Sequence, residues 1–300
     1  MHRHVAFGLR WDSDVPLEQF ALAPDHAGPA TVLVRRAFGP LPERTEVRAM
    51  DNAVLCSDGI RFHVADEVDI DIYAAGHIDW WPGPAWTGRF PPLFYGTLAA
   101  LLLAWRGGAP VHGSSVEIDG EAWLICGPSG AGKSTLAAAL IASGHARLIA
   151  DDLSTLEAGT GGGPVLYAGR PAIRLFPALA DQMRATCEVC EHPGNDKLLV
   201  LPPQVDPIAP VPLAGTIILG ADAAAIPVWR RSAFLDTQVF RPRWMRAIPD
   251  WHARFRILHD AGTTLPMLSL PIADIRDQTT FSARAEEALL VARAARYRLA

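Results

Sequence analysis

The sequence predicts an α/β fold that is preceded by a smaller, mostly β region. Residues 121–126 are apolar, a glycine-rich turn follows them, and residues 136–143 favour a helix, so the three segments form a strand–turn–helix unit. The first eighty residues contain short alternating segments and no segment of helical period. We therefore expect a β-rich N-terminal domain at residues 1–90 and an α/β domain at residues 91–300.

The N-terminal region is expected to consist of strands. Alternation of apolar and polar residues predicts strands at 5–11, 31–36 and 68–73, and a hairpin over 54–64. Residues 80–86 are rich in Trp, Pro and Gly. We interpret them as a link whose aromatic rings pack between two layers, with a peptide-docking surface as the alternative.

The larger region mixes helices and strands. A helix is expected over 91–106, where a pair of glycines ends it. Strands at 111–118 and 122–126 are expected to form a hairpin before the glycine-rich turn, and a strand at 147–150 follows the next helix. Further strands are expected at 164–168, 172–176, 197–201, 214–219 and 267–270, and further helices at 178–183, 244–260 and 281–297.

Length and composition exclude several classes of protein. The chain has 300 residues and a formal net charge of -5, which argues against a nucleic-acid partner or a membrane surface bound through bulk charge. The longest apolar run, residues 98–105, is too short to span a bilayer, and residues 1–5 do not begin a signal peptide. Four cysteines in a chain of this length do not make a disulfide framework, so we expect a cytoplasmic setting.

The glycine-rich turn fits the phosphate-binding pattern G-x-x-x-x-G-K-[ST]. Glycines let the backbone wrap a phosphate, and the N-terminus of the following helix adds partial positive charge. Lys133, expected to face solvent, can reach the β- and γ-phosphates, and the Ser134 hydroxyl can bind Mg²⁺. The residues expected to bind nucleotide here are Gly127, Ser129, Gly130, Ala131, Gly132, Lys133, Ser134 and Thr135.

Two adjacent carboxylates end the strand that follows this helix. Asp151 and Asp152 stand where an α/β sheet presents its ligands. One carboxylate can hold Mg²⁺ and the other can take a proton from an attacking hydroxyl. We assign the base to Asp151 and the metal to Asp152 with Ser134, and the reverse assignment stays open. A solvated turn or a helix cap is the alternative interpretation.

Three other side chains are candidates for the same site. His112 is expected near the loop because the predicted hairpin brings it there, although a histidine can equally be a structural donor. Arg170 and Arg174 can contact phosphates, with a surface ion pair as the alternative. Lys197 can add charge near the γ-phosphate, with a solvated lysine as the alternative.

The segment Cys187-x-x-Cys190-x-His192 has the spacing of three zinc ligands. A fourth ligand is not evident nearby, so we expect no stoichiometric zinc and interpret the segment as a loop with incidental cysteines.

Taken in order, these segments resemble the catalytic core of the HPr kinase/phosphorylase family, over about forty continuous residues. The resemblance implies a kinase core similar to that of phosphoenolpyruvate carboxykinase. The implied kinase uses ATP and Mg²⁺, and its phosphate acceptor is a serine hydroxyl. The segments that carry it are His112-Gly113, Asp119-Gly120, Gly127 to Ser134, Gly144-His145 and Leu148 to Asp152. The residues that inherit site roles are His112, Lys133, Ser134, Asp151 and Asp152.

Two departures from the family point away from HPr as the substrate. Thr135 stands where the family has a glutamate, and residues 169–176 lack the family's later glutamate-containing signature. The opening residues 7–17 are instead similar to divergent HPr-kinase-like proteins of peptide-modification clusters, some of which phosphorylate the C-terminal serine of lasso peptide precursors. The resemblance thus implies a peptide or protein serine as acceptor and leaves room for a homo-oligomer. A nucleotide-sensing binding module and a small-molecule kinase are the alternatives.

Overall fold

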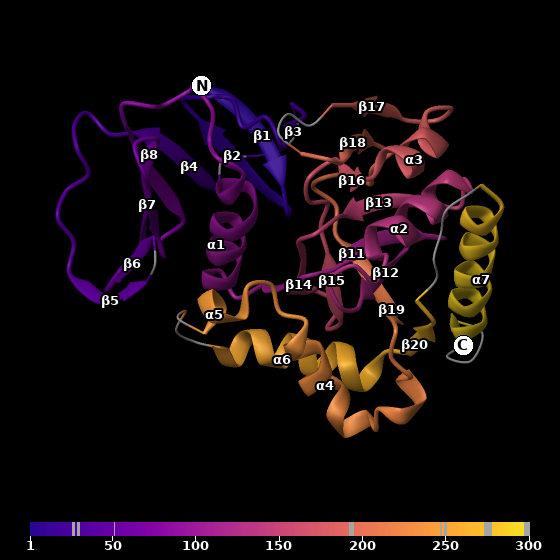
Figure 1. Ribbon diagram of the computed structural model, residues 1–300. Coiled ribbons are helices and arrows are strands. Elements are labelled where there is room, and N and C mark those ends of the chain that lie inside the picture. Colours follow the sequence, from indigo (N-terminus) through magenta and orange to yellow (C-terminus); the bar gives the residue numbers. More distant parts are fainter. Residues whose placement is uncertain are drawn as a thin grey trace.

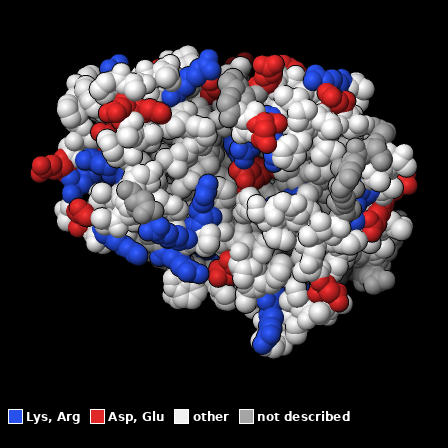
Figure 2. All heavy atoms as spheres, in the orientation of Figure 1, with Lys and Arg blue, Asp and Glu red and all other residues white. Residues whose placement is uncertain are grey.

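The computed structural model describes the chain except for residues 26, 27, 29, 30, 51, 192–194, 247, 249, 250, 273–277 and 297–300. It has an N-terminal β region beside a mixed α/β region (Figure 1), so the predicted fold class is confirmed. Charged side chains of both signs gather in the middle of the same view, between the two regions (Figure 2).

The N-terminal region is one sheet, which among the described residues has nine strands in the order β3-β1-β2-β4-β9-β8-β7-β6-β5. Its strands are β1 (His2–Ala6), β2 (Leu9–Ser13), β3 (Ala21–Leu22), β4 (Val32–Arg36), β5 (Glu46–Met50), β6 (Ala53–Cys56), β7 (Gly59–Val64), β8 (Val68–Tyr73) and β9 (His77–Pro82). The apolar residues of β8 are buried on alternate positions, as the period of a strand requires.

Two details of this region differ from the prediction. The strand expected at 5–11 is two strands, because Phe7 and Gly8 both have positive φ and turn the chain back on itself. Trp80, expected in a link, lies in β9, where it is buried and its ring is 4.9 Å from that of Trp86 and 5.3 Å from that of Phe90. The contacts therefore favour aromatic packing for this cluster.

The N-terminal sheet packs against a helical segment that follows it. This segment is a π-helical turn, η1 (Phe94–Leu98), continued by α1 (Ala99–Trp105). All of its residues from Phe94 to Ala104 are buried, and they form one apolar cluster with the inner face of the sheet. In Figure 1, α1 lies beside the strands of this sheet, with α5 below it.

The α/β region is built on a second sheet, with the strand order β10-β14-β15-β19-β12-β11-β13 and with β20 beside β19 among the described residues. Its strands are β10 (Ala109–Val111), β11 (Ser114–Ile118), β12 (Glu121–Cys126), β13 (Ala146–Ala150), β14 (Ser154–Ala158), β15 (Pro164–Leu166), β19 (Val211–Leu219) and β20 (Met267–Leu270). A small third sheet contains β16 (Ile173–Leu175), β17 (Glu188–Cys190) and β18 (Leu198–Leu201).

Helices cover this sheet. α2 (Lys133–Ala142) packs against β11 and β13 on one side and against the long α7 (Gln278–Arg296) on the other. The remaining helical turns are α3 (Pro177–Ala180), η2 (Asp181–Met183), η3 (Ala223–Ala225), α4 (Val228–Thr237), α5 (Pro242–Met245) and α6 (Trp251–Thr264). Among the described residues, no helix is long and apolar enough to cross a bilayer.

Two further corrections concern this region. The strand expected at 111–118 is interrupted, because β10 ends at Val111 and β11 begins at Ser114. β10 pairs with β14 whereas β11 pairs with β12 and β13, so His112 lies in the link between the strands. The helix expected near 244–260 begins at Trp251, and the helix α4 was not predicted.

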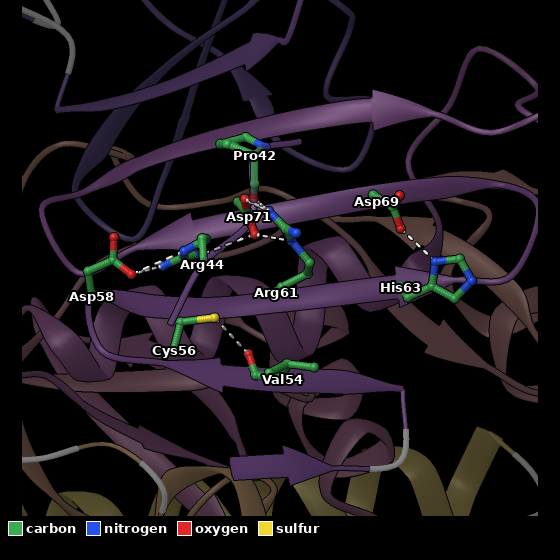
Figure 3. Close-up of polar contacts among 9 residues, drawn as sticks. All are labelled: Pro42, Arg44, Val54, Cys56, Asp58, Arg61, His63, Asp69 and Asp71. Carbon is green, nitrogen blue, oxygen red and sulfur yellow. Dashed lines mark hydrogen bonds and ion pairs between the residues drawn. The ribbon is translucent and has the colours of Figure 1, made fainter. Parts of the chain in front are cut away.

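A buried carboxylate anchors the outer half of the N-terminal sheet (Figure 3). Asp71 in β8 has no exposed side-chain surface, and it accepts hydrogen bonds from Arg44 at 3.0 Å and from Arg61 at 2.8 Å. Arg44 also pairs with Asp58 and lies 4.4 Å from the ring centre of Tyr73. The network therefore joins the loop before β5 to β7 and β8.

A buried histidine makes the stability of this sheet depend on pH. His4 is 4% exposed and its Nε2 accepts the backbone N–H of Leu17 at 3.1 Å. Burial lowers the pKa of His4 below its usual 6.5, although a hydrogen bond to the Phe20 carbonyl opposes this. Below pH 6.5 the unfolded chain binds a proton that the folded chain does not, so stability should be lost as the pH falls.

We expect His4→Gln to reduce this loss. Urea unfolding at about pH 7.5 and about pH 5.5 should show a smaller pH dependence for the variant than for the wild type. The exposed His145, changed to Gln, serves as the control and should leave the dependence unaltered. Equal slopes for the wild type and His4→Gln would show that His4 does not carry the effect.

Candidate active site

The predicted phosphate loop connects β12 to α2. Gly132, with φ 92°, precedes α2 in a left-handed conformation that residues with side chains rarely adopt. The Lys133 ammonium donates to the carbonyls of Gly127 at 3.0 Å and Pro128 at 3.1 Å. Lys133 is only 8% exposed, so the expectation that it faces solvent is wrong: the loop carbonyls hold its side chain inward. Burial lowers the pKa of Lys133, against the opposing effect of Cys126 and the two aspartates.

Asp151 connects the phosphate loop to the sheet. Its Oδ1 accepts hydrogen bonds from the hydroxyls of Ser114 at 2.6 Å and Ser134 at 2.8 Å, and the residue is 4% exposed. Ser134 is in the first turn of α2, Ser114 begins β11, and Asp151 follows the end of β13. Three elements of the α/β region thus converge on one carboxylate. Ser114 was not predicted, because its proximity depends on strand pairing that its own sequence context does not reveal.

Asp152 lies against three cationic or ionisable side chains. Its Oδ1 is 3.3 Å from Nδ1 of His112, and its Oδ2 is 3.2 Å from Arg170 and 2.9 Å from Arg174. Burial alone would raise the pKa of Asp152, but the hydrogen bond from His112 and the charges of both arginines outweigh it, so the pKa lies well below its usual range. Asp152 therefore stands as a carboxylate surrounded by positive charge.

The two aspartates contact different side chains, and these contacts differ from the pairing assigned from the sequence. Ser134 was paired with Asp152 as a metal site, but its hydroxyl contacts Asp151. The physical reason is the backbone: Asp152 has φ 69°, which turns the chain after β13 and directs consecutive side chains to different neighbours. The side chain of Asp152 faces His112 instead.

A cavity of about 350 Å³ brings most of the predicted residues together. It is lined by His112, Ser114, Ser129, Gly130, Gly132, Lys133, Ser134, Thr135, Asp151, Asp152, Arg174, Leu175, Phe176, Leu179, Asn195 and Lys197. Ala131 is buried and outside this lining, and Gly127 lines a neighbouring cavity. The predicted phosphate contacts Arg174 and Lys197 thus line the same cavity as the predicted phosphate loop.

Part of the lining of this cavity is apolar. Phe176 is 49% exposed, and the Lys197 ammonium lies 4.7 Å from its ring centre. Leu175 and Leu179 are beside it in the lining. Sequence reasoning missed these residues, although a phenylalanine two positions after the predicted contact Arg174 is a signal that could have indicated them.

A second cavity of about 460 Å³ adjoins the first. The two share His112, Ser129 and Asp152 in their linings. The rest of the second lining is Gly127, Pro128, Thr237, Gln238, Val239, Phe240, Arg241 and Pro242. Asp152 is therefore on the boundary between two spaces, whereas Asp151 lines only the first of them.

The donor set fits Mg²⁺. Ser134 and Asp151 offer oxygen atoms that contact each other in the lining of the first cavity. Mg²⁺ is bound in phosphoryl-transfer sites by one or two such groups together with substrate phosphates. Among the described residues, no group of three or more His, Cys, Asp and Glu side chains could hold a metal. Cys187 and Cys190 carry free thiols, and His192 lies outside the described residues.

Comparison with known proteins agrees with the sequence resemblance. Residues 107–163 match the family model described as HPr Serine kinase C-terminal domain. Among solved structures, the HPr(Ser) kinase/phosphatase from Coxiella burnetii is 16% identical, with 60% of this chain and 97% of that chain covered and a TM-score of 0.30. No curated protein gives a match. The resemblance to the HPr kinase family is thus confirmed for residues 107–163, the segment that carries the phosphate loop and both aspartates.

Proposed function

We propose that this chain is an ATP- and Mg²⁺-dependent kinase that phosphorylates a serine hydroxyl of a peptide or protein. The observation that carries the proposal is the arrangement of the two aspartates. Asp151 contacts the phosphate-loop Ser134, while Asp152 lies on the boundary between the two cavities. A site for phosphoryl transfer needs both features: a place for the donor phosphates and a carboxylate where the acceptor arrives.

ATP occupies the first cavity in this proposal. The loop amides, the N-terminus of α2 and Lys133 receive the phosphates, and Arg174 and Lys197 add positive charge to the same lining. Phe176 and its leucine neighbours offer an apolar surface on which a base can stack. The lining therefore provides for both ends of the nucleotide.

Ser134 and Asp151 are the residues that would hold Mg²⁺, which supplies neutralisation of phosphate charge when it is bound. Ser114 supports this arrangement, because its hydroxyl donates to the same carboxylate oxygen at 2.6 Å. This choice reverses the assignment made from the sequence, in which Asp152 held the metal.

Asp152 and His112 then receive the acceptor. The serine oxygen forms a bond to the γ-phosphorus, and the bond from that phosphorus to the β,γ-bridging oxygen breaks with its electron pair leaving on ADP. The hydroxyl proton passes to the Asp152 carboxylate, which can release it to solvent because its side chain is 27% exposed.

The low pKa of Asp152 in the free protein opposes this role, since a good base has a pKa near the working pH. Position decides in favour of Asp152. Arg174 lines the nucleotide cavity as well as pairing with Asp152, so bound phosphates compete for its charge and relieve Asp152 of one cation.

The acceptor is proposed to be a peptide or protein serine. Its sharpest version, suggested by the resemblance to kinases of peptide-modification clusters, is the C-terminal serine of a lasso peptide precursor. A nucleotide-sensing module is the competing function, and it has no need of a carboxylate between two cavities. The two functions differ in one result: only a kinase moves the γ-phosphate to serine.

Lys133→Ala tests the proposal directly. Incubation with γ-labelled ATP, Mg²⁺ and serine-containing peptides should give phosphoserine for the wild type. The variant should transfer about 10²–10³-fold more slowly, because a charged donor to the phosphates is lost. ATP affinity, measured by calorimetry, should fall as well.

Arg147→Ala is the matched control. Arg147 is a half-exposed cation outside both cavities, paired with Glu117, and its loss should leave transfer unchanged. Thermal unfolding should show that Lys133→Ala remains folded. Phosphoserine absent with every peptide, together with normal ATP binding, would favour the sensing module, whereas unchanged ATP affinity in Lys133→Ala would exclude a nucleotide site at this loop.

A further inference from the structure

The second cavity lies where an acceptor is needed. It shares His112, Ser129 and Asp152 with the cavity proposed for ATP, and it extends from them to residues 237–242. Phosphoryl transfer is roughly in line, so the attacking oxygen approaches the phosphorus from the side opposite the leaving group. A group in the second cavity reaches the shared residues without crossing the space of the nucleotide.

The far wall of this cavity is fixed to the sheet. The backbone N–H of His112 donates to the Gln238 carbonyl at 2.7 Å, and that of Phe240 donates to the Pro110 carbonyl at 2.9 Å. Val111 and Val239 form a β-bridge between the same segments. Phe240 is 5% exposed, and its ring centre is 6.2 Å from that of His112. Residues 237–242 therefore keep a defined position relative to His112.

Arg241 provides positive charge on this wall. It is exposed, and its guanidinium lies 5.8 Å from the ring centre of Phe240. Its backbone has φ 48° and ψ 61°, a left-handed conformation that places it between the end of the 238–240 segment and α5. Figure 2 shows basic side chains gathered over the α5 region. No carboxylate of a described residue pairs with Arg241, whereas Arg170 and Arg174 are both paired with Asp152.

We propose that the second cavity is the acceptor site and that Arg241 binds a carboxylate carried by the acceptor peptide close to its serine. The inference rests on the proposed kinase function. An arginine guanidinium binds a carboxylate through two parallel hydrogen bonds. Arg241 lines the second cavity, and no carboxylate of a described residue occupies its donors. The carboxylate can come from the C-terminus of a peptide that ends in serine or from an acidic residue beside an internal serine.

Two pairs of peptides distinguish these sources. The first pair ends in serine with either a free carboxylate or an amide, and the second has an internal serine followed by Asp or Asn. The wild type should prefer the carboxylate member of one pair or both by about 10–100-fold in kcat/KM. In Arg241→Asn, which keeps a residue tolerant of left-handed φ, this preference should fall to near unity.

Two further variants sharpen the result. Arg241→Lys keeps the charge and loses the fork, so it should retain part of the preference. Arg230→Asn removes an exposed arginine of α4 that lines neither cavity, and it should keep the full preference. ATP affinity should be the same in all of them, because Arg241 is outside the lining of the first cavity.

A binding measurement separates this inference from the kinase proposal. Fluorescence anisotropy with the same peptides, Mg²⁺ and a non-hydrolysable ATP analogue reports acceptor recognition without transfer. Transfer without any carboxylate preference, or with a preference that survives in Arg241→Asn, would overturn the role of Arg241 and leave the kinase standing. A preference in binding that Arg241→Asn abolishes, without transfer, would support Arg241 as the residue that binds the peptide carboxylate but would overturn the kinase, and with it the acceptor role of the cavity. If the wild type shows no transfer and no carboxylate preference, both the kinase proposal and the role of Arg241 are wrong.

Discussion

Asp71→Ala is expected to lower the free energy of unfolding by about 3–5 kcal/mol, the usual cost of leaving buried charges without their partner. Asp71 has no exposed side-chain surface, and the side chain of Arg44 beside it is only 6% exposed. Arg61 is 24% exposed and can recover some hydration. Removal of one carboxylate thus leaves Arg44 with its partner Asp58 alone. Urea unfolding at neutral pH measures the loss.

A matched control comes from the same strand. Asp69 also pairs across β7 and β8, with His63, but the two side chains are 36% and 67% exposed. Asp69→Ala should cost no more than about 1 kcal/mol, as exposed pairs do. If the two variants lose the same stability, the depth of burial does not decide the energetics of these pairs and our account of the network is wrong.

The N-terminal sheet also supports the site. The N–H of Phe7, in the turn after β1, donates to the carbonyl of Ala168 at 2.6 Å. Gln19 accepts a hydrogen bond at 3.1 Å from Arg170, which in turn contacts Asp152. Loss of this sheet would remove one of the contacts that hold Arg170 beside Asp152. The two regions are therefore connected at the residues where the proposed chemistry takes place.

The central unit of the fold could be predicted because its signals are local. The spacing of Gly127, Gly132 and Lys133 requires a strand before the loop and a helix after it, and both are present as β12 and α2. The alternation in residues 68–73 likewise predicted β8. Such patterns depend on residues that are adjacent in sequence, so they predict an element without knowledge of its contacts with distant segments.

What could not be predicted depends on pairing between distant segments. Ser114 reaches Asp151 because β11 pairs with β13, and residues 238–240 line the second cavity because they bind back to the segment at β10. The break between β10 and β11 at His112 also has a tertiary cause, since β10 pairs with β14 whereas β11 pairs with β12. Arg241 could not be placed at this cavity from the sequence, because nothing near it in the chain indicates what it faces.

The two aspartates give the last and most informative test. Asp152→Asn should lower the rate of phosphate transfer by about 10²–10⁴-fold, the usual contribution of a general base. ATP affinity should be kept or should rise, because the change removes a negative charge beside Arg170 and Arg174. Asparagine tolerates the left-handed φ of 69° at this position, so the turn after β13 should persist.

Asp151→Asn should act differently. The contact of Asp151 with Ser134 makes it the proposed Mg²⁺ ligand, so the variant should bind Mg²⁺-ATP more weakly. Excess Mg²⁺ should partly restore its rate, and Ser134→Ala should behave in the same way because it removes the other oxygen donor. Transfer to a serine peptide is measured for all three variants over a magnesium titration, together with ATP binding.

The magnesium titration decides between the two assignments. Rescue of Asp151→Asn but not of Asp152→Asn would establish the assignment that the contacts favour. Rescue of Asp152→Asn alone would restore the assignment made from the sequence, in which Asp151 is the base. If both variants lose only affinity and keep full turnover at saturation, neither carboxylate takes the proton, since a base acts on the chemical step and not on the binding of ATP. The position of Asp152 between the two cavities would then have to serve binding of the acceptor, together with Arg241 in the lining of the second cavity.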